Sequence, residues 1–157
     1  MIKTADLCDT YIDQLQVLEI PLQSFGQKQH FHGEIATLKL FEDNTLVRTV
    51  LEQQGNDRVL VIDGGGSSRC ALIGDNIAAL IEKNNWAGVV VYGCIRDAFD
   101  INQMNVGIKA LGTTPVKSIK RNEGQTDITV RFGGVEFTPK DYLYADVDGI
   151  VVSKEKF

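Results

Sequence analysis

Residues 58–75 read RVLVIDGGGSSRCALIGD and residues 86–97 read WAGVVVYGCIRD, and these two stretches decide the fold. The first contains the uninterrupted apolar run 59–62, which predicts a buried strand that a run of three glycines then ends. Residues 75–85 fit a helix, and residues 88–92 form a second apolar strand. Because continuous Val/Ile strands separated by a helix are typical of a parallel pair covered on its faces, we expect a right-handed βαβ unit here.

The segments before this unit predict two helices and a strand. A first helix over residues 4–14 would open at Thr4, which is a good N-terminal capping residue. The alternating stretch IATLKLF at 35–41 predicts a strand. Asp43 and Asn44 then fit the cap of a helix that ends near Gly55.

Short strands dominate the sequence after residue 107. The stretches IKAL, PVKSI, TDITVRF and GVEF each predict a strand, with Gly133-Gly134 as a tight turn between the last two, and residues 149–152 add another. Because helices come mostly first and short strands later, we expect an α+β fold, an α/β sandwich. Its layers would be β/β/α, as in swivelling domains, and a parallel βαβ portion would carry the site.

Length and charge limit the possible functions. The chain has 157 residues, which fits one domain over 1–157, and its 43% hydrophobic and 24% charged residues are typical of globular proteins. The net charge of −5 and the scarcity of clustered Lys and Arg argue against general nucleic-acid binding. No apolar run is long enough to cross a membrane, and the acidic N-terminus does not resemble a targeting signal, so we expect a cytoplasmic protein.

A candidate site lies at the carboxyl ends of the two predicted parallel strands. One loop would run from Asp63 through glycines 64–66 to Gly74 and Asp75, and the other from Gly93 to Arg96 and Asp97. Open sheets of this type bind ligands at that edge, so residues about 20 positions apart should meet. Glycines 64–66 would let a ligand approach the backbone closely.

Each residue of this site suits a small dianionic oxoacid. The backbone amides at the predicted helix start, those of Gly74, Asp75, Asn76 and Ile77, would hold a carboxylate. Arg96 could bind a carboxylate at two points or stabilise developing negative charge. Asp97 could be a hard oxygen ligand for Mg²⁺ or Mn²⁺, ions that often take only one or two protein carboxylates.

A purely structural interpretation also fits each residue taken alone. Asp75 suits a helix cap, the glycines suit a flexible turn, and an adjacent Arg-Asp pair is common. The combined spacing Asp-x20-Arg-Asp is more specific, because composition predicts only about 0.04 such triples by chance in a chain like this one.

Other polar or reactive residues have simpler explanations. His30 and His32 fit a partly exposed loop or interface better than a metal pair, and Cys94 fits a small buried hydrophobe better than a nucleophile. Lys117 to Arg121 fits a solvated strand end better than an RNA contact. The acidic residues Asp141, Asp146 and Asp148 fit a polar turn, and Trp86 fits core or interface packing. Three widely spaced cysteines predict no disulfide framework.

Several stretches of the chain together resemble the RraA-like family. They are the two stretches quoted first, FEDN at 41–44, and FGGVEF and YADVDGIVVS near the C-terminus. That family includes inhibitors of ribonuclease E and metal-dependent class II aldolases that split 4-hydroxy-4-methyl-2-oxoglutarate into two pyruvates. A menaquinone-pathway methyltransferase label also attaches to such sequences, but this chain lacks a Gly-rich methyl-donor motif with the usual acidic partner.

The resemblance implies roles for the triple. The aldolases have a similar Asp-x20-Arg-Asp triple, which corresponds to Asp75, Arg96 and Asp97 in this sequence. The resemblance implies that Asp97 binds the metal and that Arg96 binds the substrate and stabilises its developing oxyanion. It also implies that Asp75 orients a water for proton transfer. Oxaloacetate decarboxylation is an implied second activity, and a ring-shaped homotrimer is the implied assembly. The regulators lack the aspartate after the arginine, although the compact ends of this chain resemble them, so binding to ribonuclease E is the alternative function.

Overall fold

A ten-stranded sheet runs through the molecule in the computed structural model, which describes residues 1–157. The helices are α1 (Thr4–Tyr11), the 3-10 turn η1 (Ile12–Gln14), α2 (Thr45–Leu51), α3 (Asp75–Lys83) and α4 (Ala98–Ile101). The strands are β1 (Leu15–Val17), β2 (Gln23–Phe25), β3 (Phe31–Lys39), β4 (Val59–Asp63), β5 (Ala71–Ile73), β6 (Gly88–Ile95), β7 (Ile108–Thr113), β8 (Gln125–Thr126), β9 (Val130–Phe132), β10 (Val135–Phe137), β11 (Tyr142–Ala145) and β12 (Ile150–Ser153).

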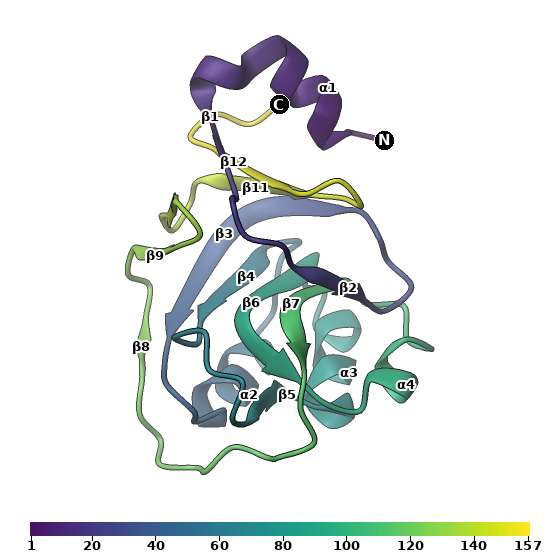
Figure 1. Cartoon of the computed structure of the whole chain (residues 1–157), viewed down its shortest axis with the longest axis vertical. Coiled ribbons are helices and arrows are strands. Elements are labelled where there is room, and N and C mark those ends of the chain that lie inside the picture. Colours follow the sequence, from purple (N-terminus) through teal and green to yellow (C-terminus); the bar gives the residue numbers. More distant parts are fainter.

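The centre of the sheet is parallel, as the apolar strands predicted. Strands β3, β4, β6 and β7 pair in parallel in that order, and α3 connects β4 to β6 through the short strand β5. The predicted βαβ unit is therefore confirmed. Antiparallel strands extend the sheet on both sides, with β11, β12 and β1 beyond β3, and β2 beyond β7 (Figure 1).

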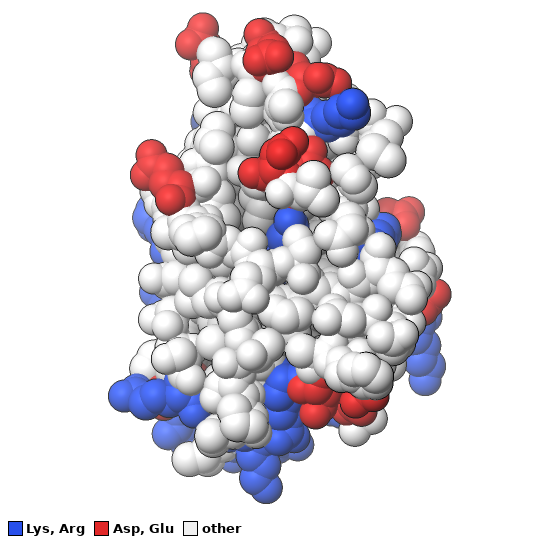
Figure 2. Space-filling model, turned by 45° about the vertical axis from the view of Figure 1, so that its right-hand side comes forward, with Lys and Arg blue, Asp and Glu red and all other residues white.

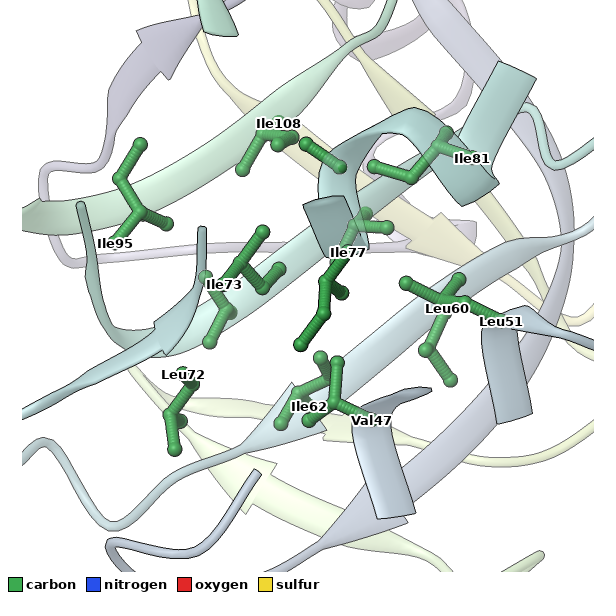
Figure 3. Packing of buried hydrophobic residues seen from close by; sticks show 14 of the residues in the cluster. Val47, Leu51, Leu60, Ile62, Leu72, Ile73, Ile77, Ile81, Ile95 and Ile108 are labelled. Carbon is green, nitrogen blue, oxygen red and sulfur yellow. The ribbon is translucent and has the colours of Figure 1, made fainter. Parts of the chain in front are cut away.

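Burial on both faces explains the continuous apolar sequence of the central strands. Leu60 and Ile62 of β4 face the helices and pack in one cluster with Val47 of α2 and Ile77 of α3 (Figure 3). Val61, one position along, belongs to a second cluster on the opposite face. Side chains alternate across a strand, so a strand covered on both faces needs an apolar residue at every position.

The second cluster is covered by other strands, which supply the third layer. It joins β4 and β6 to the β9–β10 hairpin through Phe132 and Phe137, and to β11 and β12 through Leu143 and Val152. Helices, parallel strands and short antiparallel strands thus form α, β and β layers. The expected α+β sandwich is confirmed.

Several boundaries differ from the sequence prediction. Strand β3 begins at Phe31 and includes His32, and β6 continues to Ile95 where a loop from Gly93 was expected. The predicted strand at 115–119 is wrong, because this segment makes only an isolated bridge between Lys117 and Ala71. Four further strands, β1, β2, β5 and β11, and the helix α4 were not predicted.

Two smaller expectations concern packing and the membrane. Trp86 is buried in the core, and its indole N–H donates to the carbonyl of Gln53 at 3.0 Å, so the packing prediction is confirmed. The helices of this fold are all too short or too polar to cross a membrane.

Candidate functional site

A cleft of about 660 Å³ lies where α2, the start of α3, the end of β6 and the segment 117–120 meet. Gly74, Asp75, Asn76 and Ile77 line it from the β5–α3 turn, and Arg96 and Asp97 line it from the end of β6. All six residues of the predicted site therefore lie in one cleft, although they come from two separate stretches of the sequence.

Pairing between β5 and β6 brings these two stretches together. Ile73 lies beside Ile95 in the parallel register, and the backbone N–H of Arg96 donates to the carbonyl of Ile73 at 2.9 Å. The chain then turns sharply at Asp97, which has a left-handed backbone with φ of 57° and precedes α4. This turn directs Asp97 back toward the start of α3, where its Oδ2 accepts the N–H of Asp75 at 3.1 Å.

The predicted row of free amides is only partly correct. The amide of Asp75 donates to Asp97, and the amide of Asn76 donates to Oδ1 of Asp75 at 2.8 Å. A substrate carboxylate would have to compete with these protein carboxylates for the two amides. Helix starts satisfy their unpaired N–H groups with nearby acceptors, and here the acceptors belong to the site itself.

The three principal side chains are one arginine and two aspartates, and only Arg96 and Asp97 form an ion pair. The Nε of Arg96 lies 3.9 Å from Oδ2 of Asp97, and the two side chains are 40% and 35% exposed. The terminal nitrogens of the Arg96 guanidinium form no ion pair with a protein carboxylate, so they remain accessible to a ligand. A planar cation beside two carboxylates can bind an anionic oxoacid and a divalent cation together.

Gly74 allows this close arrangement. A Cβ on Gly74 would lie 2.8 Å from Oδ2 of Asp97, closer than real Cβ atoms approach an oxygen. The backbone of Gly74, with φ of −112°, is open to any residue, so the close approach of the carboxylate is what favours glycine.

The glycines at 64–66 do not contribute to the cleft, and that prediction is wrong. Strand β5 intervenes between them and α3, and a Cβ on Gly65 or Gly66 would meet Phe41 or Tyr92 instead of a ligand. The positive φ values of both residues, 69° and 72°, show that they form a tight turn. The amide of Gly65 donates to Oδ1 of Asp63 within this turn.

Sequence reasoning missed half of the cleft. Arg48 of α2 and Glu52, the residue that follows this helix, line it together with Lys117 and Lys120. Lys117, Lys120 and Arg121 are exposed, as expected, but the segment is irregular instead of a strand end and it borders the cleft. The only signal in the sequence was the local excess of cations, and that signal does not say which other element the segment approaches.

The remaining candidates lie outside the cleft. Cys94 and Cys70 are buried, and burial raises the pKa of both thiols, which confirms the hydrophobic interpretation of Cys94. His32 stacks on Tyr144 from strand β3, so the loop expectation for His32 is wrong, and both histidines line a separate hollow of about 170 Å³. Asp146 organises a polar turn before β12 by accepting the amides of Asp148 and Gly149, as expected.

The donor set fits a hydrated cation held partly by substrate. Across residues 1–157, no three His, Cys, Asp or Glu side chains gather as a metal cage. Asp97 and Asp75 nevertheless bring two carboxylates to the same helix start. Mg²⁺ and Mn²⁺ accept one or two protein carboxylates when water and substrate oxygens complete the shell.

A model of the RraA-like family, described as Aldolase/RraA, matches residues 4–152. A protein of Aromatoleum aromaticum that carries the provisional name 4-hydroxy-4-methyl-2-oxoglutarate aldolase is 55% identical, over 97% of this chain and 96% of its own. A protein of Bacillus cereus with the same provisional name is 46% identical, over 99% and 98% of the two chains.

Two solved structures are similar along their whole length. One, from Geobacillus kaustophilus, is described as an S-adenosylmethionine:2-dimethylmenaquinone methyltransferase and is 50% identical with a TM-score of 0.97, over 99% of this chain and 97% of its own. The other is the RNA-processing inhibitor RraA from Thermus thermophilis, 42% identical with a TM-score of 0.96, over 100% and 95% of the two chains.

Proposed function

Because the chain belongs to the RraA-like family, we propose that it is a divalent-metal-dependent lyase that cleaves 4-hydroxy-4-methyl-2-oxoglutarate into two molecules of pyruvate. The observation that carries the proposal is the convergence of Asp75, Arg96 and Asp97 in one cleft. The names of relatives about half identical over the full chain support this substrate.

The cleavage has three chemical steps that the protein must assist. The 4-hydroxyl loses its proton, the bond between C3 and C4 breaks, and the electron pair passes into the 2-oxo acid half, which is then protonated at C3. Arg96, with its free terminal nitrogens, would bind the 2-oxo acid and offset the charge that develops on its oxygen. Asp75 would orient a water that transfers the proton, since its carboxylate lies at the helix start beside Asp97.

Asp97 would hold the cation, with Mg²⁺ or Mn²⁺ as the metal. The cation, when bound, supplies Lewis acidity at the keto oxygen. Oxaloacetate is also a 2-oxo acid that releases pyruvate when a carbon–carbon bond breaks, so we propose its decarboxylation as a second activity of the same residues.

A coupled assay for pyruvate tests the proposal. The wild type should release pyruvate with Mg²⁺, lose that activity in EDTA, and regain it when Mg²⁺ or Mn²⁺ is restored. Asp97→Ala should lower kcat/KM by roughly 100-fold or more, because ligand loss removes the metal. Asp100→Ala is the matched control, since Asp100 is an exposed aspartate of the adjacent helix α4 that does not line the cleft. A turnover rate that is unchanged in EDTA, or unchanged in Asp97→Ala, would contradict the proposal.

A second candidate function is the inhibition of ribonuclease E. The 42% identity to the RNA-processing inhibitor from Thermus thermophilis supports it. Binding to the ribonuclease should survive Asp97→Ala, because protein binding needs no catalytic metal. Sedimentation of the two proteins together would measure it, and a wild type that leaves the ribonuclease unbound would exclude this role.

The assembly that the family resemblance implies, a homotrimer, is also part of the proposal. Phe99 is 79% exposed and lies two positions after Asp97, which supports a subunit contact near the site. Light scattering on the purified protein would give the mass, and a monomer at micromolar concentration would contradict the trimer.

A further inference from the structure

The wall of the cleft formed by α2 and the segment 117–120 is cationic and weakly paired. Arg48 approaches only Glu52, with 3.7 Å between Nη1 and Oε1, and both side chains are about half exposed. Lys117 and Lys120 have no carboxylate within 4.0 Å, while both line the cleft. Figure 2 shows basic side chains gathered at the lower end of the molecule, where Figure 1 places α2 and the chain between β7 and β8.

A buried carboxylate fixes this wall in place. Asp43 is fully buried, and its Oδ1 accepts both the N–H and the hydroxyl of Thr45 at the start of α2. Its Oδ2 accepts the amides of Arg121 and Glu123, at 2.8 and 3.1 Å, from the other segment. One side chain therefore sets the position of the 117–123 segment relative to α2.

Asn44, at the start of α2, contributes one contact and one unpaired atom to the same wall. The backbone N–H of Asn44 donates to the hydroxyl of Ser118, a buried residue between the two lysines, at 3.1 Å. The side-chain Oδ1 of Asn44 is buried and has no hydrogen-bond donor in the protein. Buried polar atoms are almost always paired, so an unpaired one at a cleft wall points to a ligand or water as its partner.

We propose that Arg48, Lys117 and Lys120 form a subsite for the distal carboxylate of a dicarboxylic 2-oxoacid. The inference rests on the proposed function, in which Arg96 and Asp97 hold the 2-oxo end. A cleft of about 660 Å³ is far larger than a three-carbon oxoacid needs, and its second set of charges is cationic. The protein would therefore prefer 2-oxo acids with a carboxylate at each end over monocarboxylates such as pyruvate.

Calorimetry with two probes that the proposed reaction cannot cleave tests the subsite directly. Pyruvate offers only the 2-oxo acid end, whereas 2-oxoglutarate adds the distal carboxylate without the hydroxyl that cleavage needs. With Mg²⁺ present, the wild type should bind 2-oxoglutarate roughly tenfold or more tightly than pyruvate. In Lys117→Ala/Lys120→Ala and in Arg48→Ala, the affinity for 2-oxoglutarate should fall toward that for pyruvate, while pyruvate affinity stays unchanged.

The controls separate a subsite from general charge and from stability. Lys83→Ala removes an exposed lysine at the end of α3 that does not line the cleft, and it should leave both affinities unchanged. Circular dichroism melting should show that each variant is folded. Equal affinity of the wild type for both probes, or an equal loss for both probes in the variants, would overturn the subsite.

The binding experiment tests the subsite separately from the proposed cleavage reaction. If the wild type prefers 2-oxoglutarate and loses that preference in the variants, the subsite stands even when no pyruvate is released from 4-hydroxy-4-methyl-2-oxoglutarate. If cleavage is observed, the same variants should raise KM roughly tenfold with little change in kcat, because the distal carboxylate is bound equally in the ground and transition states.

Discussion

Gly74 is the residue at which a single added carbon should disturb the site most selectively. Its Cβ would lie 2.8 Å from Oδ2 of Asp97, so Gly74→Ala should displace that carboxylate from the start of α3. A shift of about 1 Å in a catalytic group can lower activity by roughly 100-fold, and we expect a loss of at least tenfold in kcat/KM. Steady-state pyruvate release, combined with a thermal melt, measures both effects.

Gly149→Ala is the matched control for this substitution. A Cβ there would meet no atom within 4 Å, and Gly149 lies in the turn before β12, outside the cleft. The control should retain full activity. Gly74→Ala with wild-type kcat/KM would mean that Asp97 does not need its observed position.

At the scale of elements, Asp43 connects the start of α2 to the irregular segment that contains Arg121 and Glu123. Burial disfavours its ionised form, but hydrogen bonds from Thr45, Glu123 and Arg121 outweigh this effect and lower its pKa from 3.8 to about 2. A lowered pKa in the folded state stabilises the protein above pH 4, by about 2 kcal/mol, and this contribution is lost as the pH falls from about 4 to about 2. Asp43→Asn should therefore destabilise the protein at pH 7.

Urea unfolding of wild type and Asp43→Asn at several pH values checks this expectation. The difference in unfolding free energy should be largest at pH 5 to 7 and should shrink as the pH falls from about 4, where Asp43 of the unfolded chain gains its proton, to about 2, where Asp43 of the folded protein gains its own. Asp100→Asn, in an exposed position on α4, should match the wild type throughout. A difference between Asp43→Asn and the wild type that stays constant down to pH 2 would contradict the role of the charge.

The elements that could be predicted are those whose own sequence carries the pattern. Strands β4 and β6 are apolar at nearly every position and α3 has a clear apolar face, so the meeting of Asp75 with Arg96 and Asp97 followed from parallel topology. Strands β2 and β11 are only three and four residues long and exist through pairing with β7 and β3, which lie about 85 and 110 positions away in the sequence.

The cationic half of the cleft escaped prediction for the same reason. Arg48 lies on a helix whose apolar face was evident, but its approach to Lys117 and Lys120 depends on the irregular path of residues 114–123. That path is set by the four hydrogen bonds to Asp43, which the sequence predicted only as a helix cap.

At the scale of the whole molecule, both chain ends pack together at the end opposite the cleft (Figure 1). Tyr11 of α1 stacks on Phe157, with 4.2 Å between ring centroids. Thr4, expected to cap α1 itself, instead donates its N–H and its hydroxyl to Asp146, both at 2.7 Å, and Lys3 occupies the capping position. The buried Lys109 of β7 donates to Ser24 of β2 and to the carbonyl of Asp146.

Asp146 therefore joins α1 to the sheet, and its removal should release the N-terminal helix alone. In Asp146→Ala, hydrogen exchange of the amides in residues 4–11 should accelerate by roughly tenfold or more, since about 1 to 3 kcal/mol of hydrogen bonding is lost locally. Amides of β4 and β6 should exchange as in the wild type, and pyruvate release should be unchanged because the cleft lies at the other end.

Asp148→Ala, an exposed neighbour in the same turn, is the control and should leave α1 protected. Faster exchange spread evenly over α1 and the sheet would show instead that Asp146 supports global stability, and unchanged exchange in α1 would show that the Tyr11–Phe157 stack anchors the helix without it.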